Sequence, residues 1–176
     1  MGFDAVCLGN HEFDNGIDEL SRRLRNLKVP AVCTNYDFSQ TSLAGVVKPY
    51  VIVRKAKKKI GIIGVLADMS TLASTEVNAI LKYQHPAELA TSYATWLREE
   101  KRCDMVICLS HLGYEGESYV DPELAAQTRG IDVIVGGHSH TTLEDLKTVK
   151  NLDGKDVVIV TDGKWGFTVG HLSVDF

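Results

Sequence analysis

Residues 131–141 read IDVIVGGHSHT, an apolar run that ends abruptly in two glycines and two histidines. The same order, an apolar run followed by a histidine with a glycine beside it, recurs at residues 5–14 (AVCLGNHEFD) and 105–113 (MVICLSHLG). Short β-branched runs that alternate with helical patterns are typical of α/β proteins. We therefore expect each run to be a strand of an α/β fold, with a histidine-bearing loop at its carboxyl end.

The rest of the chain continues this alternation. The expected strands are Ala5–Gly9, Ala31–Asn35, Tyr50–Lys55, Lys59–Leu66, Met105–Ser110, Val133–Gly136, Val157–Thr161 and Val169–Phe176. Helices are expected over Ile17–Leu27, with Ile17, Leu20, Leu24 and Leu27 on one face, from Pro86 onward, and over Pro122–Arg129. The 176 residues are enough for one domain.

Four of the six histidines follow expected strands: His11, His111, His138 and His140. The loops past the carboxyl ends of parallel strands meet in one crevice of an open α/β sheet, so these side chains are expected to converge. Imidazoles together with amide or carboxylate oxygens suit divalent metals such as Zn or Mn. An extended backbone over 138–140 would point both histidine rings the same way.

The two remaining histidines receive no role. His85 precedes a helix-opening proline and His171 alternates with polar residues on the last expected strand, so both are expected to face solvent. Any single loop histidine is more often a solvated surface group than a metal ligand, and the expectation rests on the four taken together.

Composition and charge exclude several function classes. The net charge is −4, which argues against binding to a nucleic-acid polymer. The basic run at 54–59 (RKAKKK) lacks interleaved aromatic residues and is interpreted as a solvated hairpin turn. No apolar stretch is long enough for a transmembrane segment, and the chain shows no signal peptide. The four cysteines form no C-x-x-C pair and are interpreted as buried free thiols.

Three ordered motifs carry a family resemblance: GNHEFD at 9–14, SHLG at 110–113 and GHSHT at 137–141. They resemble the calcineurin-like metallophosphatase superfamily, in particular its bacterial 5′-nucleotidase / UDP-sugar hydrolase / 2′,3′-cyclic phosphodiesterase branch. The segments KPY (48–50), IGIIG (60–64) and DGKWG (162–166) also look like that branch.

The resemblance implies a metallophosphatase-type α/β sandwich, two mixed sheets flanked by helices, that lacks the first strand–helix units. Residues 1–176 would form a single metallophosphatase domain, its C-terminal portion, without a nucleoside-binding second domain. The implied location is the periplasm or the cell surface.

The same resemblance implies the site. Asn10, His111 and His138 would ligate one metal ion, and His140 a second. His11 would be the catalytic imidazole near the leaving group, with Asp14 as its carboxylate partner. The implied reaction is hydrolysis of phosphate esters, nucleotides in particular, by attack of a metal-bound hydroxide. The two divalent ions would be Mn, Zn, Fe, Ni or Co. Glu12 receives no role from the resemblance and is expected to support the ligands from behind or to be a helix-start carboxylate, rather than to be a ligand.

The chain also departs from the family pattern. It contains no Asp-x-His and no Gly-Asp, the segments that supply most ligands of one metal and the bridging aspartate. We therefore expect these residues alone to bind metal weakly and to hydrolyse esters poorly. A strand such as Ala5–Leu8 is expected to present an open edge, through which two copies would pair. Two alternatives stay open, a non-catalytic remnant or interaction module and a protein with a single structural metal.

Overall fold

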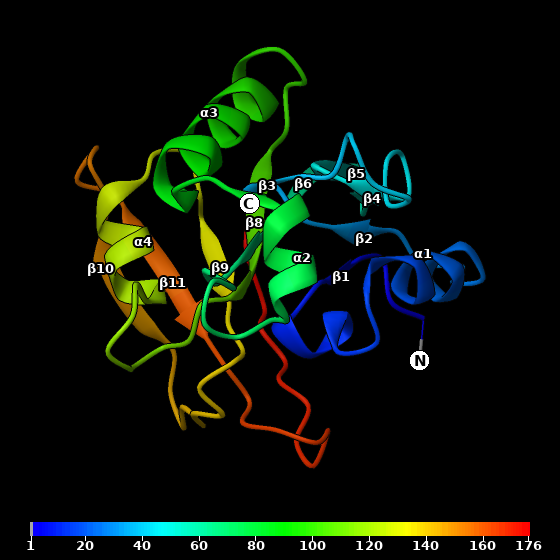
Figure 1. Cartoon of the computed structure of the whole chain (residues 1–176). Helices are drawn as coiled ribbons and strands as arrows, with labels where there is room; N and C mark the ends of the chain where they lie inside the picture. Colours follow the sequence, from blue (N-terminus) through cyan, green and yellow to red (C-terminus); the bar gives the residue numbers. More distant parts are fainter. Residues whose placement is uncertain (1) are drawn as a thin grey trace.

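The computed structural model describes residues 2–176 and is built around a six-stranded sheet (Figure 1). Its strand order is β10-β11-β9-β8-β6-β5, with β5 (Tyr50–Lys55), β6 (Lys58–Leu66), β8 (Met105–His111), β9 (Val133–Val135), β10 (Lys147–Lys150) and β11 (Asp156–Val160). The four central strands β11, β9, β8 and β6 run parallel, and β10 and β5 pair antiparallel at the two edges. This sheet is mixed, as expected.

Two helices cover one face of the six-stranded sheet, α3 (Pro86–Glu99) and α4 (Asp121–Gln127). In Figure 1, α4 lies in front of β10 and β11, with α3 above. Every second strand residue points at the helices, so Ile63, Val106 and Ile134 are fully buried against the helical Leu97 and Leu124. This apolar layer holds the carboxyl ends of the strands in a fixed relative position.

A smaller parallel sheet packs beside β6, in the order β1-β2-β4. Its strands are β1 (Val6–Cys7), β2 (Ala31–Val32) and β4 (Val47–Lys48). The two sheets approach so closely at Gly64 that an added Cβ would lie 2.5 Å from the carbonyl oxygen of Val32. Only glycine allows this contact, which brings β1 next to β6 and β8.

The remaining elements surround a second hydrophobic core, next to the small sheet. They are a 3₁₀ helix (Asn10–Phe13), α1 (Ile17–Arg25), β3 (Tyr36–Asp37), α2 (Thr75–Ile80) and β7 (Lys82–Tyr83). Helix α1 has acidic residues in its first turn and arginines in its last, which suits the helix dipole. Leu20 is buried, whereas Leu27 lies beyond the helix and is 47% exposed, so the expected apolar face is one turn shorter.

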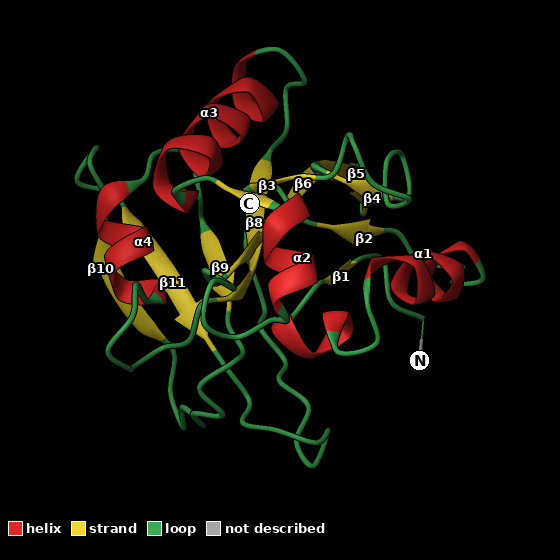
Figure 2. Cartoon of the chain, in the orientation of Figure 1, coloured by secondary structure: helices red, strands yellow, loops and turns green. Residues whose placement is uncertain are grey.

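Several sequence predictions need correction. The stretch Val169–Phe176 is not a strand: the chain runs as loop after β11 (Figure 2), and most of these residues are exposed. Alternation alone predicted the strand, but no neighbouring strand among residues 2–176 supplies backbone partners there. The strands expected over Ala5–Gly9 and Ala31–Asn35 are reduced to β1 and β2. Strands β3, β4, β7 and β10 and helix α2 were not expected, because they are short or mostly polar.

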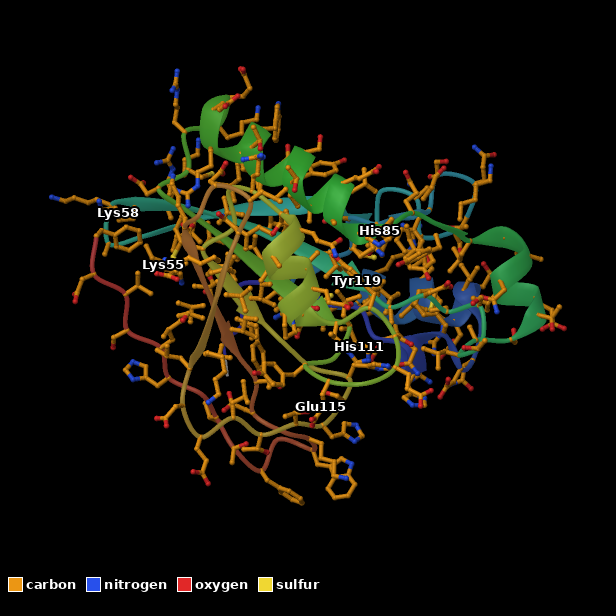
Figure 3. The ribbon with its side chains drawn as sticks, turned by 90° about the vertical axis from the view of Figure 1, so that its left-hand side faces the viewer. Lys55, Lys58, His85, His111, Glu115 and Tyr119 are labelled. Atoms are coloured by element: carbon orange, nitrogen blue, oxygen red, sulfur yellow. The ribbon has the colours of Figure 1, made fainter. Side chains whose placement is uncertain are left out.

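The basic run is a hairpin turn, as predicted. Lys55 pairs with Lys58 across the β5–β6 turn, where Ala56 and Lys57 have positive φ. Strand β6 starts at this hairpin and pairs with His111 at its other end, so the basic run is far from the histidine loops. Figure 3 shows Lys55 and Lys58 well apart from His111.

Strand β1 forms one edge of the small sheet, pairing only with β2 among the described residues. This matches the expected open edge, while pairing between two copies stays a prediction. No helix in the described part of the chain has the length and apolar character needed to cross a bilayer. The location implied by the family resemblance also stays a prediction.

Candidate active site

Three strand ends meet where the site was expected. Strands β8 and β9 are parallel neighbours, with Leu109 opposite Val135, so the loops after them lie side by side. Strand β1 approaches β6 through the Cys7 thiol, 3.5 Å from the carbonyl oxygen of Val65. The loop after β1 therefore reaches the same edge of the large sheet.

Asn10, His111 and His138 come together at this edge. The Oδ1 atom of Asn10 lies 3.0 Å from Nε2 of His111, and the ring centroids of His111 and His138 are 4.8 Å apart. Gly9 makes this approach possible, because a Cβ there would lie 2.6 Å from Cε1 of His111. The predicted convergence of one amide and two imidazoles is confirmed as geometry.

The electrostatics of this pair favour neutral imidazoles. Burial, together with repulsion from His138, His11 and His140 as cations, lowers the pKa of His111 to about 4. Burial also lowers the pKa of His138, with added repulsion from His140 and His11. Neutral imidazole is the form that ligates metals. The four histidines also interact electrostatically, because charge on one lowers the pKa of another.

His11 and Asp14 form a solvent-accessible dyad beside this cluster. Nδ1 of His11 lies 3.0 Å from Oδ2 of Asp14, and the two side chains are 81% and 56% exposed. Both sit on the 3₁₀ turn after β1, where residues three apart share a face. The carboxylate orients the ring and leaves its other nitrogen free to meet a bound molecule.

The 138–140 segment is not extended, which corrects the sequence prediction. His138 and His140 both have positive φ, at 75° and 59°. Such a backbone makes a tight loop, so strand alternation does not set the ring directions. Ser139 accepts a hydrogen bond from the Tyr114 amide at 3.0 Å, and Thr141 donates to Glu115 at 2.9 Å. These bonds tie the loop to the segment after β8, where Figure 3 labels Glu115.

The donor atoms fit a divalent metal ion. Among residues 2–176, no group of three or more His, Cys, Asp or Glu side chains is arranged to hold one. The buried amide oxygen of Asn10 lies beside the ring of His111, so an amide oxygen and two imidazoles share this edge. One oxygen and two neutral nitrogens suit borderline divalent metals, and His140 lies in the loop that carries His138.

Of the two alternatives for Glu12, the structure shows the helix-start carboxylate, and the burial of Asp121 was not expected. The Glu12 carboxylate accepts a hydrogen bond from the Gly9 amide at 2.6 Å, as a helix-start residue does. Asp121 is fully buried beneath the histidine loops and accepts a hydrogen bond from Ser110. An aspartate at the start of a helix reads as a surface residue in sequence, so no local signal separated it from ordinary helix starts.

The two histidines without a role are exposed, as expected. The ring of His85 packs edge-on against Tyr119, with centroids 4.6 Å apart (Figure 3). His171 lies in the C-terminal loop rather than on a strand.

Known proteins resemble this chain in sequence and fold. A 5′-nucleotidase-related protein of Glossina morsitans morsitans is 38% identical over 145 residues, which is 80% of this chain and 25% of that protein. An apyrase of Tabanus yao is 36% identical, covering 89% of this chain and 27% of its own length. The solved 5′-nucleotidase precursor of Thermus thermophilus superposes with a TM-score of 0.82 at 34% identity, over 93% of this chain and 34% of that one.

This chain thus spans about a quarter to a third of the length of these relatives. The sequence model of the family described as calcineurin-like phosphoesterase matches residues 3–142, which includes all three histidine loops. The family model covers most of the chain, and the 5′-nucleotidase precursor has a similar fold. The chain belongs to the calcineurin-like phosphoesterases, a family of phosphoric ester hydrolases.

Proposed function

We propose that this chain carries part of the catalytic site of a metal-dependent phosphoesterase that hydrolyses nucleotides. The observation that carries the proposal is the convergence of Asn10 and His111, 3.0 Å apart, with His138 beside them and the His11–Asp14 dyad at the same edge. A cluster of neutral donors next to an exposed imidazole–carboxylate pair suits attack on a phosphate ester.

Calcineurin-like phosphoesterases use divalent metal ions. In this chain Asn10, His111 and His138 would hold one ion, and His140 would contribute to a second. Bound divalent ions would supply Lewis-acid stabilisation of the charge on the phosphoryl group. The low pKa of His111 keeps its ring neutral at neutral pH, so binding does not have to displace the extra proton of an imidazolium.

His11 would handle the leaving group. As an exposed imidazole it is able to donate a proton to the departing ester oxygen, while the Asp14 carboxylate holds the ring through Nδ1. The proton would leave from Nε2, the nitrogen that Asp14 does not occupy. His11 lies in the 3₁₀ helix that begins at Asn10, and Asp14 is its C-cap, so the proposed proton donor lies next to a proposed metal ligand.

Nucleotides are the proposed substrate class because of the relatives. Proteins named 5′-nucleotidase, from Rattus norvegicus among others, match this chain over its full length at 29% identity. The chain offers three proposed ligands for one metal ion and one for the other, which is an incomplete ligand set. We therefore propose that these residues alone bind metal weakly and hydrolyse the substrate slowly.

The test is Mn²⁺-dependent hydrolysis of a nucleoside 5′-monophosphate, with calorimetric titration of Mn²⁺ alongside. We expect Mn²⁺ to raise the rate for the wild-type chain, and His111→Ala to abolish both the increase and Mn²⁺ binding. His171→Ala, an exposed histidine in the C-terminal loop, serves as the matched control and should behave like the wild type. Equal rates for the wild type and His111→Ala would overturn the catalytic proposal and support a non-catalytic remnant.

A structural metal site is disfavoured by the cysteines. Structural zinc sites use four closed ligands, usually including thiolates. Burial raises the pKa of Cys33 to about 12 and that of Cys7 and Cys108 well above the ordinary value. Buried, protonated thiols are poor metal ligands.

A further inference from the structure

Asp121 is a fully buried carboxylate that lies directly beneath the candidate site. It is the first residue of α4, at the end of the loop that follows β8. Acidic residues at helix starts are ordinarily exposed, where the helix dipole and water both stabilise them. Complete burial of this side chain therefore needs a reason beyond helix capping.

One side of Asp121 contacts the turn that carries His111. Its Oδ1 atom accepts a hydrogen bond from the Ser110 hydroxyl, and that hydroxyl in turn accepts one from the Leu112 amide at 3.2 Å. The backbone amide of Asp121 donates to the carbonyl of Gly113 at 2.8 Å. The residues on both sides of His111 are thus bound to Asp121, directly or through Ser110.

The other side of Asp121 contacts the turn that carries His138. Its Oδ2 atom is buried and has no hydrogen-bond partner among the described residues. This oxygen fills the space in front of Gly136, where an added Cβ would overlap it. The backbone N–H of Gly136 donates a hydrogen bond to the Val160 carbonyl at 2.8 Å, and Gly136 leads through Gly137 into His138. A single carboxyl group therefore lies between the two turns that carry the paired imidazoles.

A buried oxygen without a hydrogen-bond partner destabilises a fold, so its presence in a folded protein needs an explanation. Burial raises the pKa of Asp121 to about 7, with the Ser110 hydrogen bond opposing the shift. The retention of so costly a group at the junction of both turns points to a role in placing them. Residues behind metal ligands commonly orient those ligands in this way.

We propose that Asp121 is a positioning residue that sets the spacing between the His111 and His138 rings through its contacts with Ser110 and Gly136. The proposal rests on the proposed function in that the two rings are taken as metal ligands. It assigns no contact between Asp121 and the metal or substrate. Shape and the Ser110 hydrogen bond carry the effect, so an isosteric amide should replace the carboxyl group.

The experiment compares Asp121→Ala, Asp121→Asn and a control, Thr128→Val. Thr128 is equally buried at the other end of the same helix, and its hydroxyl donates to the Ala125 carbonyl at 3.3 Å. The first readout is Mn²⁺ affinity by calorimetry, and the second is the nuclear Overhauser effect between the His111 and His138 rings in the metal-free chain. The 4.8 Å separation of the ring centroids brings ring protons within range of that effect.

We expect Asp121→Ala to lose the ring-to-ring effect and to lower Mn²⁺ affinity by about 10-fold or more. Asp121→Asn and Thr128→Val should keep the effect and retain affinity within about 3-fold. If Asp121→Ala fails to fold, Ser110→Ala removes only the hydroxyl donor and should weaken the ring-to-ring effect.

An Asp121→Ala chain with unchanged ring contact and affinity would overturn the proposal. Loss in Asp121→Asn as large as in Asp121→Ala would overturn it too, because the charge rather than the position would then matter. A wild-type chain that binds no Mn²⁺ would overturn the proposed function alone, since the ring contact still tests Asp121.

Discussion

Asn10 Oδ1 lies 3.0 Å from His111 Nε2, although the two residues are 101 positions apart in the sequence. The contact joins the small parallel sheet to the large mixed one, at the edge where both sets of strands end. Gly9 and Gly64 permit it, because each lacks the Cβ that would block the approach.

Removing the Asn10 amide should weaken metal binding. Asn10→Ala leaves His111 and His138 as the only donors of the first ion, so we expect Mn²⁺ affinity to fall by at least about 10-fold. Calorimetric titration measures the change. Asn26→Ala, at the exposed end of α1, is the matched control and should bind like the wild type. Undiminished binding by Asn10→Ala would exclude the amide as a ligand.

The dyad makes a prediction about leaving groups. His11→Ala should lower kcat for a nucleoside 5′-monophosphate by about 100-fold, because the departing alkoxide needs a proton. With p-nitrophenyl phosphate, whose leaving group is stable as an anion, the loss should be much smaller. Asp14→Asn should lower kcat for the nucleotide by about 10-fold with little change in KM. Steady-state kinetics on both substrates decide the matter, and equal losses on the two would contradict a proton-donor role.

The approach of the two sheets makes a stability prediction. Gly64→Ala places a methyl group 2.5 Å from the backbone oxygen of Val32, which cannot rotate away, so we expect a loss of about 2–3 kcal/mol in the free energy of unfolding. Gly61→Ala on the same strand meets side-chain atoms alone, the end of Leu97 at 2.9 Å and the Cys103 sulfur at 3.4 Å, and should cost less than half as much. Urea denaturation measures both variants, and the reverse order would show that the sheets separate easily.

Asp121 predicts a pH dependence of stability. The pKa of Asp121 in the folded chain, about 7, lies above the ordinary value of 3.8. The contribution of Asp121 to the free energy of unfolding is therefore fully present below pH 3.8 and is lost as the pH rises through about 7. His111 acts in the opposite sense, since its lowered pKa costs stability as the pH falls below 6.5. The two dependences partly cancel in the wild-type chain.

Asp121→Asn isolates the first of these effects. The difference in unfolding free energy between this variant and the wild type should move in favour of the variant between about pH 4 and 7, by about 1.4 kcal/mol per pH unit at most. Urea denaturation at several pH values measures this difference. A difference that stays constant with pH would show that Asp121 is ionised in the folded chain.

Much of this arrangement was predictable from local sequence. Apolar β-branched runs placed β6, β8, β9 and β11 within one or two residues. The basic run at 54–59 predicted its hairpin, because alternating strands on either side leave only a turn between them. The predicted convergence of His111 and His138 followed from the rule that parallel strands present their carboxyl ends together.

The C-terminal stretch shows where such reasoning fails. Val169–Phe176 alternates like a strand, yet a strand exists only where a neighbour accepts its backbone hydrogen bonds, and sequence does not name that neighbour. The prediction of an extended backbone over 138–140 failed for a related reason. Positive φ at two histidines is strained, and the surrounding loops rather than the residues themselves impose it.

By itself, the sequence determined which residues form the strands of the large sheet and which polar groups follow them, because hydrophobic period and turn residues act over a few positions. Only the tertiary structure decided that Asn10 reaches His111, that burial lowers the pKa of both His111 and His138, and that Asp121 is buried between their turns. Those properties depend on packing between segments that lie from 11 to 101 positions apart in the sequence, and on the exclusion of water from the space they enclose.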